Sequence, residues 1–90
     1  MLRPDLLDAP PGGEAVTDYD RLHLKLYLRL LDAEADGADW RDVVLVLFEL
    51  DPARDPARAQ RLYDAHLSRA QWMTQQGYRD LLKDAPPQGR

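Results

Sequence analysis

The chain has 90 residues, no cysteine, and a net charge of −4 from 12 Lys and Arg against 16 Asp and Glu. Ninety residues allow one small domain, and the lack of cysteine excludes disulfide bridges and thiolate metal sites. A hydrophobic content of 44% with 31% charged residues is typical of a globular protein, and no apolar run approaches the roughly 18 residues of a membrane span.

Residues 1–17 are rich in proline and glycine, which oppose regular structure, and are predicted to form a flexible N-terminal arm. Within the arm, Leu6 and Leu7 are expected to dock only weakly. Residues 84–90 hold two further prolines and a glycine and are predicted to form a disordered C-terminal tail. The folded domain is therefore expected over residues 18–83.

A first helix is predicted over residues 18–35. Thr17 or Asp18 can cap its N-terminus, and Gly37 is placed to end it in the left-handed conformation. Residues 23–30 alternate between polar and apolar side chains like a strand. However, they are rich in leucine and lack β-branched residues, which favours a helix.

The polar residues of this first helix form one narrow stripe, so its apolar surface spans well over half of the circumference. Such a helix either lies centrally in a bundle or presents a second apolar face outward. Leu24 and Leu28 belong to that second face and are candidates for contact with a partner.

A second helix is predicted over residues 40–50, with Asp39 as its N-cap. The composition of residues 43–48 also fits a buried strand. A lone strand would have no partner to pair with, so a helix is favoured.

The third helix is predicted over residues 56–76, because Asp55 can cap it, Pro56 suits its first position and Gly77 can end it. Helices without a sheet indicate an all-α fold, a small three- to four-helix bundle. Its second and third helices have the proportions of a variant helix-turn-helix unit. The predicted core consists of Leu26, Leu30, Val44, Leu47, Phe48, Leu62, Tyr63, Leu67 and Met73.

No motif in the chain predicts catalysis or cofactor binding. His23 and His66 lie on different predicted helices, and neither has a second histidine at the spacing of metal ligands. His66 shares the apolar stripe of the third helix, where a core histidine bonded to the backbone is favoured. A glycine-rich phosphate loop and a nucleophile elbow are also absent, so we expect a non-enzymatic protein with no metal and no other cofactor.

The charged residues are distributed unevenly. Residues 1–51 contain five Lys and Arg against twelve Asp and Glu, whereas residues 52–90 contain seven against four. Arg54, Arg58 and Arg61 lie at the start of the third helix, which in a helix-turn-helix unit faces the major groove of DNA. These arginines favour DNA binding. The net negative charge argues against it, because phosphate neutralisation supplies most non-specific affinity.

Trp72 lies on the polar face of the third helix, among arginines that include Arg69. Small domains rarely leave a whole indole ring in water, and two explanations are open. Either the chain reverses at Gly77 and Leu81 or Leu82 covers the ring, or Trp72 and its arginines form an exposed partner site of the kind that dominates interface energetics. The candidate partner-binding residues are Arg54, Arg58, Arg61, Arg69, Trp72, Leu24 and Leu28.

Four blocks of the chain carry a resemblance: Asp20–Ala33, Gly37–Arg41, His66–Met73 and Gly77–Leu82. The pattern Arg-Ala-x-Trp-Met followed by Gly-Tyr-Arg-x-Leu-Leu is the most specific part. Over residues 18–83 the chain resembles a proteobacterial family long catalogued as a domain of unknown function, which includes the DNA-binding domain of RovC-type transcription factors. The resemblance implies a variant helix-turn-helix fold.

That family includes activators, in which the domain is fused to other segments, and small stand-alone proteins. Resemblance to an acidic stand-alone member implies an antiactivator that binds a TraR-like regulator of the LuxR type and an FseA-like activator. It would thereby repress quorum sensing and the excision and transfer of integrative and conjugative elements. We expect a monomeric, cytoplasmic antiactivator without specific DNA binding. The alternative is a DNA-binding transcriptional regulator that uses the third helix as its recognition helix.

Overall fold

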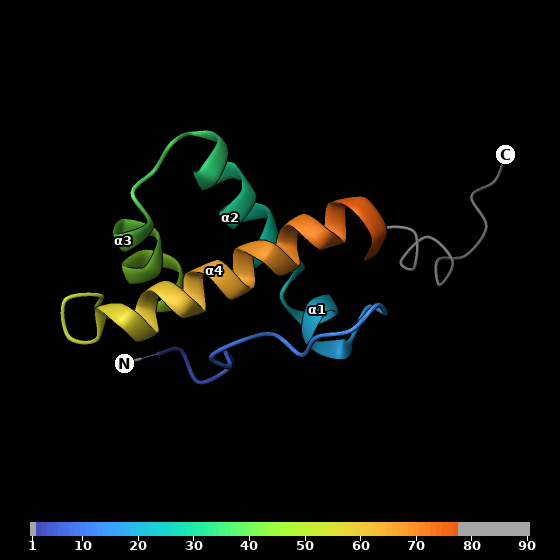
Figure 1. Cartoon of the computed structure of the whole chain (residues 1–90), viewed down its shortest axis with the longest axis horizontal. Coiled ribbons are helices and arrows are strands. Elements are labelled where there is room, and N and C mark those ends of the chain that lie inside the picture. The colour runs from blue at the N-terminus through green and yellow to red at the C-terminus, as the bar shows by residue number, and fades with distance from the viewer. Residues whose placement is uncertain (1, 78–90) are drawn as a thin grey trace, which may run out of the picture.

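The computed structural model describes residues 2–77, which are helical apart from the N-terminal arm and the turns, and contain no strand. The predicted all-α fold is thus confirmed (Figure 1). Predictions for residues 78–90, including those for Leu81 and Leu82, lie outside the described residues. The helices are α1 (Asp18–Leu22), α2 (Leu24–Ala35), α3 (Trp40–Val43), the π-helix η1 (Val44–Phe48), α4 (Pro56–Trp72) and the π-helix η2 (Met73–Gly77).

The first predicted helix is divided in two at His23. Thr17 and Asp20 form a reciprocal capping box that starts α1. At His23 the backbone leaves the helical region, with φ −111° and ψ 22°. The ring Nδ1 lies 2.9 Å from the carbonyl oxygen of Tyr19, and such local side-chain bonds compete with a regular helix. The prediction of one continuous helix over residues 18–35 was therefore wrong at this residue.

The expected caps at the other helix ends are confirmed. Gly37 follows α2 with φ +75°, a conformation that glycine adopts without steric cost. The side chain of Asp39 accepts a hydrogen bond from the Arg41 N–H and starts α3, and Asp55 does the same for Arg58 at the start of α4. The second helix ends at Phe48, where the prediction had Leu50, because Glu49 takes up the left-handed conformation with φ 59°.

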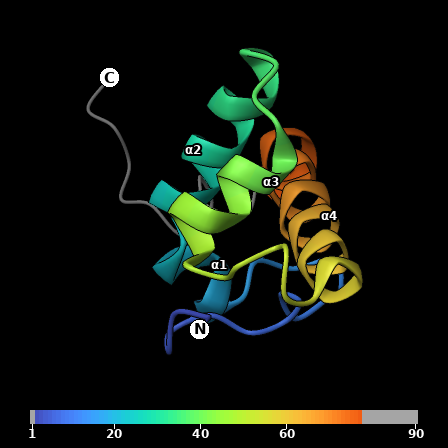
Figure 2. The ribbon, with the colours of Figure 1, turned by 90° about the vertical axis from the view of Figure 1, so that its left-hand side faces the viewer.

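The helices α2, α3 and α4 enclose the core. Figure 2 shows α2 and α3 side by side against α4, and α3 with η1 leads through a turn into α4 as in a helix-turn-helix unit. Every predicted core residue is buried except Leu47 and Leu67, which are partly buried. Tyr27, Ala59 and Ala70 are buried core residues that the prediction missed.

The N-terminal arm, residues 2–17, has no helix but packs along the domain, in contrast to the loose arm that the sequence favours. Leu6 and Val16 are buried in the core, whereas Leu7 is exposed. The Arg3 N–H donates to the carbonyl oxygen of Phe48 over 3.0 Å. In Figure 1 the arm runs below α4 along much of its length. None of the helices within residues 2–77 is long and apolar enough to cross a membrane.

Candidate nucleic-acid and partner interface

The N-terminal half of α4 and the turn before it carry three of the predicted site residues. Arg54 lies in the turn and Arg61 in the helix, and both are exposed. Arg58 is partly exposed, and its backbone N–H donates to the Asp55 carboxylate over 3.2 Å. The structure therefore places Arg54 in the turn before α4, and Arg58 and Arg61 in the first two turns of α4.

The Arg58 guanidinium is already bound by a carboxylate of the arm. Its Nε and one terminal nitrogen donate to the two oxygens of Asp8 over 3.1 and 2.7 Å. The hydrogen bond from Arg58 lowers the pKa of Asp8, so the carboxylate stays charged. Sequence reasoning missed Asp8, because no local signal links two residues that lie 50 positions apart.

Arg69 is directed into the protein and is only 8% exposed. Its Nε and a terminal nitrogen donate to the carboxylate of Asp20, the shortest of these contacts measuring 2.7 Å. Its other donors bind the arm, at the carbonyl oxygens of Gly13 and Ala15, over 2.7 and 2.8 Å. The guanidinium thus joins α4, α1 and the arm, and it is not available on the surface.

Asp20 is fully buried and is held charged by its neighbours. Burial raises the pKa of its carboxyl, but hydrogen bonds from Arg69, the Thr17 backbone N–H and the Tyr27 hydroxyl together outweigh this and bring the pKa below its ordinary value. The Tyr27 hydroxyl donates over 2.8 Å. Burial and this hydrogen bond raise the pKa of Tyr27.

Trp72 is covered in part by segments that the prediction did not consider. Its ring lies under the Arg69 guanidinium, whose carbon is 3.9 Å from the ring centroid, a cation–π contact. The same recess is lined by Ala9, Pro10 and Gly12 of the arm. Within the described residues, the N-terminal arm therefore borders the recess beside the indole, and the question of cover by Leu81 or Leu82 lies outside them.

The predicted site residues fall into three separate places. Arg58 and Trp72 are fourteen positions apart on α4, about 21 Å along the helix axis. Leu24 and Leu28 lie on α2 and line an apolar groove together with Ala70 of α4. The sequence grouped these residues into one surface, and the structure does not bring the three groups into contact.

A chain of hydrogen bonds ties the arm to the centre of α4. His66 is fully buried, and its Nδ1 donates to the carbonyl oxygen of Leu62 over 2.8 Å, as expected for a core histidine bonded to the backbone. Its Nε2 then accepts from the Tyr19 hydroxyl over 2.7 Å. The same hydroxyl accepts from the Leu7 backbone N–H over 3.1 Å. This arrangement requires the neutral imidazole.

The free energy of unfolding should fall as the pH drops below about 6.5. Burial lowers the pKa of His66 from its ordinary value of 6.5. Between that value and the lowered pKa, the unfolded chain takes up a proton that the folded protein does not, so stability decreases until the pH passes below the lowered pKa. Urea unfolding between about pH 7.5 and pH 5.5 measures this. His66→Gln is the control, and equal pH slopes in both proteins would contradict the assignment.

The sequence matches the model of a known protein family. The family model RovC_DNA-bd, described as a T6SS transcription factor DNA-binding domain, matches residues 2–83. The match covers the helices and also the N-terminal arm, which agrees with the packing of the arm against α4. A search of curated proteins found no match.

Proposed function

The chain belongs to the family of RovC-type transcription factor DNA-binding domains, and on that premise we propose that it regulates transcription by placing the N-terminal half of α4 against DNA. The observation that carries the proposal is the position of Arg54, Arg58 and Arg61 at the start of the second helix of a helix-turn-helix unit. In that unit these positions face the major groove. Arginine there can bind phosphates or the edge of guanine.

The arm modulates this surface. The carboxylate of Asp8 neutralises the Arg58 guanidinium and would repel a DNA phosphate placed next to it. The protein therefore binds DNA with fewer free cations than its sequence suggests. Gln60 is exposed on the same half of α4 and offers a side-chain amide for base recognition. DNA binding of this kind is weak at physiological salt unless the correct sequence supplies base contacts.

The proposal is tested by fluorescence anisotropy with labelled duplex DNA over a range of salt concentrations. Arg61→Ala should weaken binding and reduce the slope of log K against log salt by about 0.9, the value for one lost phosphate contact. Asp8→Asn should strengthen binding, because it releases Arg58. Arg29→Ala is the matched control, since it removes one exposed positive charge from α2 and should change neither quantity much. Equal loss with Arg29→Ala and Arg61→Ala would overturn the proposal.

A second candidate function is the antiactivator. It is favoured by the small number of available cations: the net charge is −4, Arg58 is paired with Asp8, and Arg69 is buried. The chain also resembles the small stand-alone antiactivator QseM. In this role the domain acts in the cytoplasm, binds TraR-like and FseA-like activators as a monomer, and represses quorum sensing and conjugative-element excision. Arg54 in the turn and Arg61 on α4, both exposed, would bind carboxylates of the partner.

The same variants separate the two candidate functions. If the wild-type protein binds purified TraR-like or FseA-like activator but retains no promoter fragment at physiological salt, the antiactivator is favoured. Arg61→Ala should then weaken activator binding, while Arg29→Ala leaves it unchanged. Retention of one promoter fragment over a scrambled sequence favours the DNA-binding regulator instead.

A further inference from the structure

Charged residues form a stripe along the exposed side of α2. They follow one another at intervals of four, three and four positions, which places them on one face of the helix, and all of them are exposed. The two positive charges come first and the two negative charges last. The residues of this α2 stripe are Lys25, Arg29, Asp32 and Asp36.

The order of charges in the α2 stripe is unfavourable for an isolated α2. The helix dipole favours negative charge at the N-terminus and positive charge at the C-terminus, but α2 has no acidic residue in its first turn and no basic residue in its last turn. Like charges four positions apart also repel each other, and this applies to Lys25 with Arg29 and to the two aspartates. Within residues 2–77 none of the stripe side chains forms an ion pair that would offset the repulsion. The stability of the monomer therefore does not account for the stripe.

The α2 stripe is complementary to itself when a second copy runs in the opposite direction. Its outer members, Lys25 and Asp36, lie equally far from the middle of the stripe. Its inner members, Arg29 and Asp32, also lie equally far from that point. A two-fold axis through the middle sets a second α2 antiparallel to the first, in an isologous contact. Each positive charge of the stripe then faces a negative charge of the other copy.

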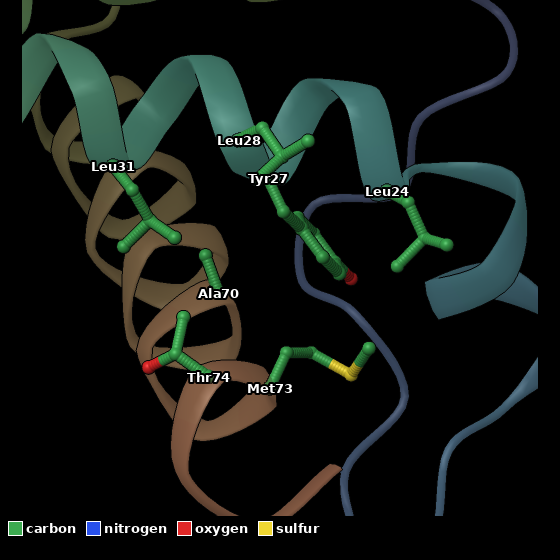
Figure 3. A pocket seen from close by; sticks show the side chains of 7 residues that line it. All are labelled: Leu24, Tyr27, Leu28, Leu31, Ala70, Met73 and Thr74. Carbon is green, nitrogen blue, oxygen red and sulfur yellow. The ribbon is translucent and has the colours of Figure 1, made fainter. Parts of the chain in front are cut away.

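Exposed apolar side chains lie on both sides of the α2 stripe. Leu28 is 63% exposed on α2, and Figure 3 shows it at the edge of an apolar groove between α2 and η2. Val46 of η1 is 71% exposed and lines a recess together with three members of the stripe. A two-fold axis sets each side of the stripe next to the same side of the other copy. Apolar surface then meets apolar surface, and its removal from water favours the contact.

We propose that the α2 stripe is a dimer contact, in which α2 of one copy of this chain packs antiparallel against α2 of a second copy. The stripe carries equal positive and negative charge. This pattern is complementary to a second copy, and it offers no excess charge to a nucleic acid or to a partner with charge of one sign. The inference is independent of the DNA-binding proposal.

The length of α2 sets the strength of this contact. α2 has 12 residues and is about 18 Å long. A contact between two helices of this length belongs to the interfaces below about 1,200 Å² in total, which are weak and transient. The dimer therefore forms only at high protein concentration. At the low micromolar concentrations of DNA-binding and unfolding experiments the chain is a monomer, in which the exposed Arg29 side chain is solvated.

Sedimentation velocity of the full-length chain from about 10 µM to about 1 mM measures the dissociation constant of the dimer. The wild-type protein should change from monomer to dimer within this range. Arg29→Asp and Asp32→Arg should each raise the dissociation constant at least about tenfold, because each reversal places like charges opposite each other twice in the symmetric contact. Glu34→Arg is the matched control, since Glu34 is exposed on the other side of α2, where it binds Gln71. This variant should dimerise like the wild type.

An equimolar mixture of Arg29→Asp and Asp32→Arg tests the symmetry of the contact. In a mixed dimer both inner positions are negative in one copy and positive in the other. The mixture should therefore dimerise at concentrations where each variant alone is a monomer. A mixture that stays monomeric would overturn the proposal. So would a wild-type protein that is monomeric at about 1 mM, or single reversals that dimerise as tightly as Glu34→Arg.

A second pair of variants at the outer positions keeps the proposal testable if an inner variant does not fold. Circular dichroism and the melting temperature at low concentration show whether each variant is folded. Lys25→Glu and Asp36→Lys should each weaken the dimer, and their equimolar mixture should restore it. Folded outer variants that dimerise like the wild type would contradict the antiparallel arrangement.

Discussion

Replacing Arg69 with methionine should lower the free energy of unfolding by about 3–5 kcal/mol, the cost of removing one partner from a buried ion pair. The reason is the state in which the variant leaves Asp20. That carboxylate is 0% exposed and receives its strongest support from Arg69, so it would remain charged without its main partner or take up a proton. The carbonyl oxygens of Gly13 and Ala15 would lose their donors as well.

Urea unfolding of the variant at neutral pH measures this loss, and Arg29→Met is the matched control. Arg29 is exposed on α2, and substitutions at such sites usually change stability by less than about 0.5 kcal/mol. An Arg69→Met protein that unfolds like the wild type but binds its target less tightly would return Arg69 to the predicted interface. Loss of stability and no separate loss of binding would make it a structural residue.

The ion pair between Arg69 and Asp20 also predicts that the folded protein loses stability in acid. The pKa of Asp20 is lowered in the folded protein, so its contribution to stability is complete above the ordinary value of 3.8 and is lost as the pH falls through the lowered pKa. In Arg69→Met that acid transition should move to higher pH, because the variant removes the Arg69 hydrogen bonds to Asp20, which lower the pKa of its carboxyl.

The helices could be predicted because their ends are determined by local chemistry. An N-cap such as Asp39 or Asp55 binds a backbone N–H two or three residues away, and Gly37 ends α2 through its own backbone. These interactions are contained within one turn of the chain. The sequence therefore shows them directly, and the structure confirms each.

The break at His23 could not be predicted in the same way. Its ring contacts Tyr19 in α1 and also Asp5 in the arm, with Nε2 3.3 Å from a carboxylate oxygen. The second contact depends on where a segment eighteen residues earlier is placed. The local pattern of leucines continues through His23 and gives no sign of it.

The predicted site was incomplete for the same physical reason. From the sequence, an arginine on a helix surface is expected to be solvated or to bind a partner, and only the tertiary structure shows that a carboxylate of the same chain lies next to it. Arg58 binds Asp8, and Arg69 binds Asp20, across 50 and 49 positions of sequence. The sequence nevertheless contained a sign that the arm packs, namely the apolar residues Leu6 and Val16. Both are buried in the structure. Apolar residues on both sides of a proline-rich segment indicate that it packs.

Replacing Phe48 with alanine should lower the free energy of unfolding by about 3–5 kcal/mol, the range for a large aromatic side chain removed from a core. Phe48 is 0% exposed and closes η1 against α4, with its ring 5.0 Å from that of His66 in an edge-on contact. Its carbonyl oxygen also receives the Arg3 N–H, so the cavity forms where the arm is attached. Total stabilities of small domains are about 5–15 kcal/mol, and this loss is a large part of that.

Leu67→Ala is the comparison for Phe48→Ala. The sequence predicted that both residues lie in the core, whereas in the structure only Phe48 is fully buried. Leu67 is only partly buried, so its replacement removes less contact and leaves an opening to solvent in place of a closed cavity. We expect its cost to fall near the lower end of the 2–5 kcal/mol range for leucine. Urea unfolding of both variants tests the order. If Leu67→Ala proved more costly than Phe48→Ala, the packing of η1 against α4 would not be the centre of the core.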